Sequence, residues 1–417
     1  MSITSYPELV KLSSSGNTVS FGGTNVDAFG RLRISAPFTL FDSQNRYSAD
    51  SQFDTSTATG GALTHLPNES SCSLAVTTTS GSSVVRQTFR TFPYQPGKSL
   101  LVLATFAMDS AKTNLRQRIG YFNTANGCFL QKDNSTVSFV LRSSTTGSVV
   151  DTRYENQSGW NGDKLDGTGS SGYTLDTTKT NILFMDFEWL GVGSVRCGFV
   201  IDGKFIVAHT FHNANQVYTS VYMTTAILNV RYEITNTGTT ASSSTLKQIC
   251  STVISEGGYE QRVVDSVARR TAVLGTISTT FLPLVSIRLN SSYLGAVVLV
   301  NRVLVLPTTN QNYEVALVKN STLTGASWVT GTFQNVDYDV SASAMTTSAT
   351  TINQIDYVTS TSQGRAALAA PTGYNFDYQL GVSLASVSDT YTIGVRTVSG
   401  ATTGDAFGSL SFYDLTN

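Results

Sequence analysis

Along most of the chain, hydrophobic and polar residues alternate in short runs. Residues typical of turns lie between these runs. Residues 99–108 form a continuous apolar run, and 116–122 and 135–143 alternate with the period of two that is typical of strands. Further on, "DGK" (Asp202–Lys204) separates two alternating runs, which predicts a hairpin. Many short strands without helices between them predict an all-β protein built from sandwiches.

The strand pattern restarts after about residue 275, which indicates a second β-sandwich. Its runs are 283–290, 296–307, 312–320, 376–386 and 391–399. A chain of 417 residues is longer than one core usually organises, so two domains are expected.

One stretch, Tyr259–Leu274, favours a short helix or an extended linker, because its valines gather on one side and its charges lie mostly opposite. We therefore predict four segments. They are an N-terminal arm at 1–60, a jelly-roll β-sandwich at 61–258, a linker or short helix at 259–280 and a C-terminal β-sandwich at 281–417. The arm carries aromatic and arginine residues without a core of its own, so we expect it to dock on another surface.

Charge and composition exclude some classes of partner. The net charge is −1, only 13% of residues are charged, and no basic block is present, which argues against nucleic-acid binding. No run approaches the ~20 apolar residues that span a bilayer, so we predict no membrane insertion. The N-terminus shows no basic start followed by an apolar run, so we expect synthesis in a cytoplasm.

The four cysteines are Cys72, Cys128, Cys197 and Cys250, and none belongs to a CxxC pair. This spacing argues against a zinc knuckle and against a disulfide framework. Free thiols fit assembly in a reducing compartment.

Two carboxylates, Asp186 and Glu188, would share one face of a strand, as a glycosidase pair would require. Some jelly-roll glucanases carry such a pair in an E-x-D-x-E motif, but Phe184 occupies the first position here. A polysaccharide depolymerase is therefore the least favoured function, and we predict no catalytic residues.

Candidate metal ligands are equally sparse. His209 and His212 are three residues apart and would point to opposite faces of a strand, and His65 is remote in sequence. Asp163 and Asp166 lie in a glycine-rich stretch that fails the EF-hand spacing. That stretch is either an Asx-rich turn or a Ca²⁺ site, and sequence does not decide between them. We predict no metal site and no cofactor.

Several long motifs resemble virion structural proteins of tailed bacteriophages. They are "DAFGRLRISAPFTLFDSQNRY" (Asp27–Tyr47), "WNGDKLDGTGSSGYTLD" (Trp160–Asp176), "DFEWLGVGSVRCGFVIDGK" (Asp186–Lys204) with "HNAN" (His212–Asn215), and "PLVSIRLN" (Pro283–Asn290) with "YEVALVKNSTLTGASW" (Tyr313–Trp328). The resemblance implies a non-enzymatic particle component with a central domain similar to concanavalin-like jelly rolls. It implies a virion location and other virion proteins as partners, and leaves tail, neck and capsid surface open.

Such appendages, fibres or decoration proteins usually form closed oligomers, so we expect a homo-oligomer, a trimer or another cyclic assembly. The arm residues expected to contact a neighbouring virion protein are Phe29, Arg31, Arg33, Phe38, Phe41 and Asp42. The alternative is that the arm packs on its own sandwich.

The alternative function is a carbohydrate-binding adhesin that attaches to host-surface glycan. Its candidate stacking residues are Trp160 and Tyr173, with Trp189 as a third aromatic for which a core position is favoured.

Overall fold

The structure is a computed structural model that describes residues 8–11, 18–21, 36–216, 219–260, 265–331, 334–348, 351–359, 366–369, 376–398 and 403–416. Nearly every element in these ranges is a β-strand, and every strand pair is antiparallel. The helical segments within them are single 3-10 turns at Pro67–Glu69 (η2), Gln157–Gly159 (η3) and Phe376–Tyr378 (η4). The prediction of an all-β protein is confirmed.

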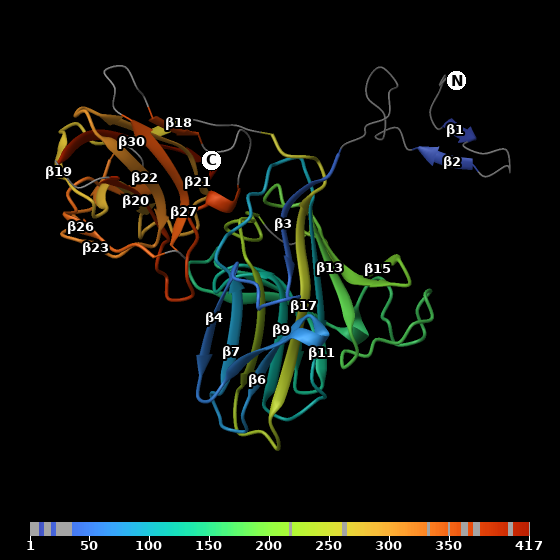
Figure 1. Cartoon of the computed structure of the whole chain (residues 1–417). Helices are drawn as coiled ribbons and strands as arrows, with labels where there is room; N and C mark the ends of the chain where they lie inside the picture. Colours follow the sequence, from blue (N-terminus) through green and yellow to red (C-terminus); the bar gives the residue numbers. More distant parts are fainter. Residues whose placement is uncertain are drawn as a thin grey trace.

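The first sandwich packs a seven-stranded sheet against an eight-stranded sheet (Figure 1). The seven-stranded sheet has the order β12-β11-β10-β9-β16-β7-β4. Its strands are β4 Phe53–Ala58, β7 Ser83–Thr88, β9 Leu115–Phe122, β10 Gly127–Asp133, β11 Thr136–Ser143, β12 Val150–Asn156 and β16 Val230–Asn236.

The eight-stranded sheet has the order β15-β14-β13-β8-β17-β6-β5, and β3 also pairs with β17. Its strands are β3 Phe38–Gln44, β5 Ala62–Leu66, β6 Ser71–Val76, β8 Leu100–Ala107, β13 Asn181–Phe187, β14 Val195–Ile201, β15 Lys204–Phe211 and β17 Ser244–Ser255. The predicted hairpin joins β14 to β15, with Ile201 opposite Lys204. Asp202 and Gly203 both have positive φ, 50° and 72°, as a type I′ turn requires.

Alternation along the strands fills the first core. In β8 every second residue is buried, and Leu100, Val102 and Phe106 are at most 1% exposed. Because successive side chains of a strand point to opposite faces, the residues between them form the outer face of the same sheet. Strand β13 follows the same rule, with Leu183 and Phe187 in the core.

The second sandwich has a five-stranded sheet of order β18-β30-β21-β28, joined by β19, and a six-stranded sheet of order β24-β25-β20-β29-β22-β27. A short pair, β23-β26, lies beside them. The strands are β18 Asp265–Arg269, β19 Leu274–Ile277, β20 Leu282–Leu289, β21 Val298–Pro307, β22 Asn312–Lys319, β23 Leu323–Thr324, β24 Val329–Thr330, β25 Val336–Asp339, β26 Ala344–Met345, β27 Ile352–Thr359, β28 Ala366–Ala369, β29 Thr390–Thr397 and β30 Gly404–Asp414.

Two predicted boundaries are corrected by the strand pairing. Strands β3 and β4 belong to the first sandwich, so the N-terminal arm ends before residue 38 and not at residue 60. Within the arm, β1 (Glu8–Lys11) pairs with β2 (Thr18–Phe21). The stretch expected as a helix or linker holds β18 and β19, because both pair with β30 and receive its hydrogen bonds.

The two sandwiches share packing where they meet. Val297, Leu299 and Phe376 of the second sandwich belong to the hydrophobic cluster of the first. Backbone groups also cross the boundary, because the Val382 N–H donates to the Phe89 carbonyl at 2.8 Å. The Gln379 side chain donates to the Thr91 carbonyl at 2.9 Å. In Figure 1 the second sandwich, orange to red, lies beside one end of the first.

Candidate functional site

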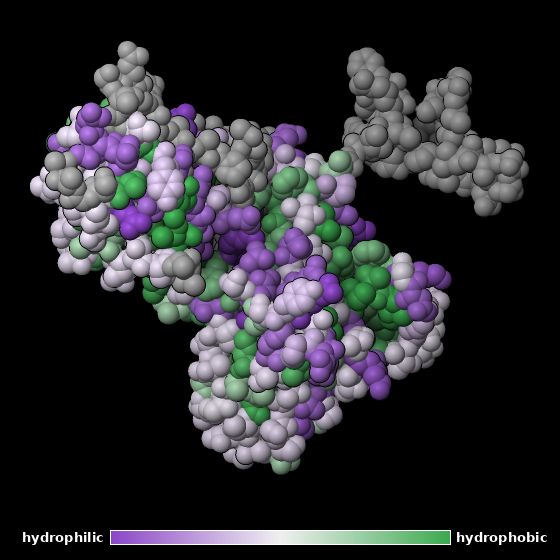
Figure 2. Space-filling model, in the orientation of Figure 1, coloured by the Kyte–Doolittle hydropathy of each residue, from purple (hydrophilic) through white to green (hydrophobic). Residues whose placement is uncertain are grey.

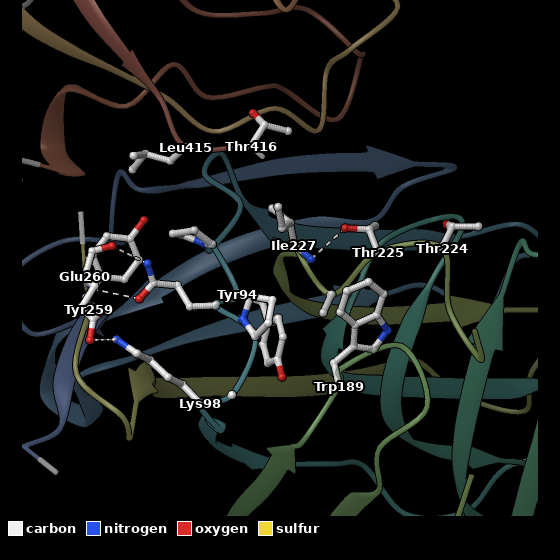
Figure 3. A pocket seen from close by; sticks show the side chains of 15 residues that line it. Tyr94, Lys98, Trp189, Thr224, Thr225, Ile227, Tyr259, Glu260, Leu415 and Thr416 are labelled. Atoms are coloured by element: carbon white, nitrogen blue, oxygen red, sulfur yellow. Dashed lines mark hydrogen bonds and ion pairs between the residues drawn. The ribbon is translucent and has the colours of Figure 1, made fainter. Parts of the chain in front are cut away.

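A pocket of about 500 Å³ opens where the first sandwich, the segment after β17 and the C-terminal residues meet (Figure 3). We call it the junction pocket. Its lining comes from five parts of the sequence: Pro93–Lys98, Trp189, Thr224–Ile227, Tyr259 with Glu260, and Leu415 with Thr416. Pockets at such meeting points are common ligand sites in proteins.

An aromatic pair forms one wall of the junction pocket. The rings of Tyr94 and Trp189 meet edge to face, with centroids 5.7 Å apart and planes at 86°. The Tyr94 hydroxyl accepts a hydrogen bond from the Leu190 N–H at 3.2 Å, which fixes its ring. Burial raises the pKa of this hydroxyl. The Trp189 Nε1 is buried and has no partner among the described residues, so the indole presents carbon atoms to the pocket.

The opposite wall is polar and ties the segment after β17 to the loop before β8. The Gln95 side chain bonds the Glu260 backbone in both directions, accepting from its N–H at 2.9 Å and donating to its carbonyl. The Lys98 Nζ lies 3.8 Å from the Glu260 carboxylate. On the side of Trp189, Thr225 accepts from the Ile227 N–H at 2.9 Å (Figure 3). The Gln95 and Lys98 contacts join two segments of the lining, and the two charged side chains lie within ion-pair distance of each other.

One predicted glycan contact is wrong. Trp160 is 2% exposed and packs in the core against Phe139, with centroids 4.9 Å apart, and against Phe199. Its Nε1 donates to the Glu155 carbonyl at 3.1 Å. The indole therefore has neither a free face nor a free donor for a sugar.

The other aromatic candidates lie nearer the surface. Tyr173 is half-buried, and its hydroxyl donates to the Asp202 carboxylate at 2.6 Å, an interaction that raises the Tyr173 pKa. Its role as a glycan contact stays a prediction. Trp189 packs against the margin of the core, as the sequence favoured, and also lines the junction pocket.

The proposed partner contacts of the arm have different surroundings. Phe41 is 2% exposed and packs on Phe53 and Phe92, so its interpretation as a partner contact is wrong. The pairing of β3 with β17 carries this side chain into the chain's own core.

For the other residues of the predicted contact set, the partner role stays a prediction. Phe38 is half-buried in an aromatic cluster with Tyr259 and Phe376, between the two sandwiches. Asp42 is exposed, and its partner role stays a prediction. The other three residues, Phe29, Arg31 and Arg33, lie outside the described residues.

The carboxylate pair does not form a glycosidase arrangement. Asp186 is 6% exposed and lies opposite Arg196 on β14, and the two side chains form a salt bridge. Glu188 follows the end of β13 and is exposed. Asp186 is thus the buried partner of an arginine, and the motif gives no support to a depolymerase.

His209 is buried, whereas His212 is exposed. Burial, Arg153 and His212 lower the pKa of His209 to about 4, so its ring is neutral at pH 7. The neutral ring accepts a hydrogen bond at Nδ1 from the Asn161 N–H at 3.4 Å. No group of three or more potential ligands in the described ranges is placed to hold a metal ion.

The aspartates of the glycine-rich stretch close turns of their own loop. The Asp163 carboxylate accepts from the backbone N–H groups of Leu165 at 2.9 Å and Ser171 at 2.7 Å. Burial acts to raise its pKa, but these hydrogen bonds outweigh it and lower the pKa. Asp166 accepts from the Thr168 N–H and hydroxyl. The observed geometry is that of Asx turns.

An apolar row crosses the outer face of the eight-stranded sheet at its β15 end. Strand register places Ile182, Val200 and Phe205 side by side, and Ile182 is 38% and Phe205 55% exposed. We call these three residues the β15 patch. Figure 2 shows hydrophobic surface in this region of the molecule. Part of the neighbouring β15 edge is covered, because the N–H groups of Gly162 and Asp163 donate to the carbonyls of Ala208 and Val207.

Comparisons with known proteins add little about function. No family model matches the chain, and no curated protein matches it. A solved protein of unknown function from Shewanella oneidensis MR-1 matches at 11% identity, with 55% of this chain and 91% of that chain covered and a TM-score of 0.35. The Emp47p carbohydrate recognition domain matches at 11% identity, with 57% and 100% covered and a TM-score of 0.32.

The CBM2 module of the evolved Dit protein of Lactobacillus casei BL23 phage J-1 matches at 6% identity, with 55% and 100% covered and a TM-score of 0.35. At these TM-scores and identities the similarity identifies neither a ligand nor a partner for this chain. In the part of the chain that the structure describes, no helix is long and apolar enough to cross a membrane.

Proposed function

We propose that the chain is a non-enzymatic structural component of a tailed-phage particle, located in a tail, neck or head-surface appendage. The family resemblance of its long motifs supports this function. The shared packing of the two sandwiches also supports it, because it makes one bilobed block from two domains. A component of this kind acts by holding its neighbours in fixed positions.

The observation that carries the proposal is the β15 patch. Isolated apolar side chains on a surface are ordinary, but a contiguous row indicates a binding surface. Because Gly162 and Asp163 already bond the β15 edge at Val207 and Ala208, we propose that a partner packs on the face and does not extend the sheet. The occupant that we propose is a second copy of this chain, as in a closed homo-oligomer.

Native mass spectrometry of the purified full chain tests the assembly. We expect a discrete oligomer for the unaltered chain and a shift to monomer for Phe205→Ser. The matched control is Tyr357→Ser on β27, which removes an aromatic side chain that is 65% exposed in the second sandwich. The control should keep the oligomer. A monomeric unaltered chain, or equal masses for both variants, would refute the self-assembly.

A second experiment tests the particle role itself. Mass spectrometry of particles purified from a culture that makes this protein should find the chain at a fixed copy number. Its recovery only in the particle-free fraction would overturn the structural function, whatever the oligomer measurement gives.

The junction pocket favours a second function, binding of a neutral saccharide. Sugar rings stack their C–H faces on aromatic carbon, and the Trp189 indole offers carbon with Tyr94 beside it. Glycan-array binding by the full chain should be lost in Trp189→Ala and retained in Trp328→Ala. Trp328 is half-exposed beneath Arg288 in the second sandwich. Binding that survives Trp189→Ala, or no binding by the unaltered chain, would exclude this pocket as the site.

A further inference from the structure

Two thiols face each other across the core of the first sandwich. Cys128 lies on β10 of the seven-stranded sheet, and Cys197 lies on β14 of the eight-stranded sheet. Their Sγ atoms are 3.5 Å apart, and both residues are fully buried. The sulfurs are therefore in contact between the two layers that form the sandwich.

The other two cysteines have different surroundings. The Cys72 thiol donates to the Asn45 side chain at 3.3 Å, and Cys250 is exposed. Among the described residues, neither thiol contacts another sulfur. The contact therefore singles out Cys128 and Cys197 from the four thiols of the chain.

A disulfide needs its sulfurs about 2.05 Å apart, so the pair must close by about 1.5 Å. The backbone next to each cysteine departs from a regular strand. Gly127 precedes Cys128 and has φ 137°, a conformation open to glycine. On the other strand, the pairing of β14 with β15 shifts register between Cys197 and Gly198. Both cysteines thus sit beside a local irregularity of their strands.

We propose that Cys128 and Cys197 form a disulfide when the protein leaves a reducing compartment, and that this bond staples the two sheets of the first sandwich together. Each thiol gives up one hydrogen, and one S–S bond forms. The two electrons and two protons pass to a small-molecule disulfide such as oxidised glutathione, which is cleaved to two thiols. The inference does not depend on the proposed function.

Burial makes this oxidation slow in the closed sandwich. It raises the pKa of the Cys197 thiol, and the adjacent Cys128 thiol raises it further. The thiolate that must attack the oxidant is therefore scarce, and a fully buried sulfur is out of reach. Exchange needs the sheets to part, so the bond forms on opening and then opposes the next opening. The bond would close a loop between residues that are 69 apart in sequence, which constrains the unfolded chain.

The test incubates the full chain with oxidised glutathione just below its melting temperature. A Cys250→Ser background removes the exposed thiol and leaves three thiols that are titratable in denaturant. We expect one thiol after oxidation, and a non-reduced peptide map that joins Cys128 to Cys197. The Tm should rise by about 5 to 10 °C and return with dithiothreitol.

Cys128→Ser and Cys197→Ser should abolish both the cross-link and the Tm rise, whereas Cys72→Ser should keep both. If a serine variant does not fold, the peptide map of the unaltered chain still decides the question. A cross-link between any other pair would overturn the proposal. Three titratable thiols that persist through repeated heating cycles with the oxidant would also overturn it.

Discussion

His209 should make the first sandwich sensitive to acid. In the folded chain its ring is a neutral acceptor for the Asn161 N–H. Protonation would place an N–H group of His209 against the Asn161 N–H, so the hydrogen bond would be lost. The new positive charge would also be buried and close to that of Arg153. The unfolded chain has no such penalty, so acid favours unfolding through this group.

The magnitude follows from the pKa. Folding lowers the His209 pKa from 6.5 to about 4. Because the folded value is the lower one, the contribution to stability is complete above pH 6.5 and is lost as the pH falls towards 4. Each pH unit between the two values is worth about 1.4 kcal/mol, which gives an upper bound of about 3 kcal/mol. We expect about 2 kcal/mol, because solvent screens part of the interaction.

Urea unfolding followed by circular dichroism from pH 7.5 to pH 4.5 measures this loss. His209→Gln keeps a polar side chain but does not titrate. Over this pH range, the variant should therefore lose about 2 kcal/mol less of its free energy of unfolding than the unaltered chain loses. His212→Gln, which removes the exposed histidine three residues away, should follow the unaltered chain. Parallel stability curves for the unaltered chain and His209→Gln would refute the reasoning.

Three further predictions concern stability. Trp160→Ala should destabilise the first sandwich by about 3–5 kcal/mol in urea unfolding, because it empties a core site. Glu233→Gln should cost about 3 kcal/mol at pH 7, because it leaves the buried Arg231 partly unpaired. Burial acts to raise the Glu233 pKa, but Arg231 and Arg118 lower it overall to below its ordinary value of 4.5. The unaltered chain should therefore lose this stability as the pH falls below 4.5, whereas the variant should not, and acid titration of both proteins checks this. Deletion of residues 1–60 removes β3 and β4 and should abolish soluble expression, whereas deletion of 1–35 keeps every strand of the sandwich.

Local pattern was sufficient to predict strands. The alternating run 135–143 corresponds to β11, and the apolar run 99–108 contains β8. The turn chemistry of Asp202 and Gly203 predicted the β14–β15 hairpin, because two positive φ angles are demanded by the short loop itself. In each of these cases the information lies within about ten residues of sequence.

The sequence pattern wrongly assigned residues 38–60 to an arm separate from the first sandwich. Phe41 lies in an aromatic-rich segment that has no apolar partner nearby in sequence, which favoured an exposed docking role. Its partner strand is β17, more than two hundred residues later, and that pairing closes the core over its ring. When a strand pairs only with strands that are distant in sequence, its own sequence does not show that it belongs to a sheet.

The aromatic residues show why a site is harder to predict than a strand. Trp160 and Trp189 both follow polar or turn residues, and nothing local separates them. Trp160 is enclosed because Phe139 and Phe199 arrive from two different sheets, whereas Trp189 stays half-exposed at the end of β13. The junction pocket is completed by Leu415 and Thr416, from the far end of the chain.

Strand period assigns a side chain to a face of a sheet, but what covers that face depends on the neighbouring strands. Ile182 and Asp186 share the outer face of β13, yet Ile182 is 38% exposed and Asp186 only 6%, because Arg196 lies over the carboxylate. The contact of Cys128 with Cys197 has the same origin, since it exists only where the two sheets stack. The binding surfaces and the thiol pair are therefore products of sheet packing. We expect variants that change this packing to alter function more than variants that change single motifs.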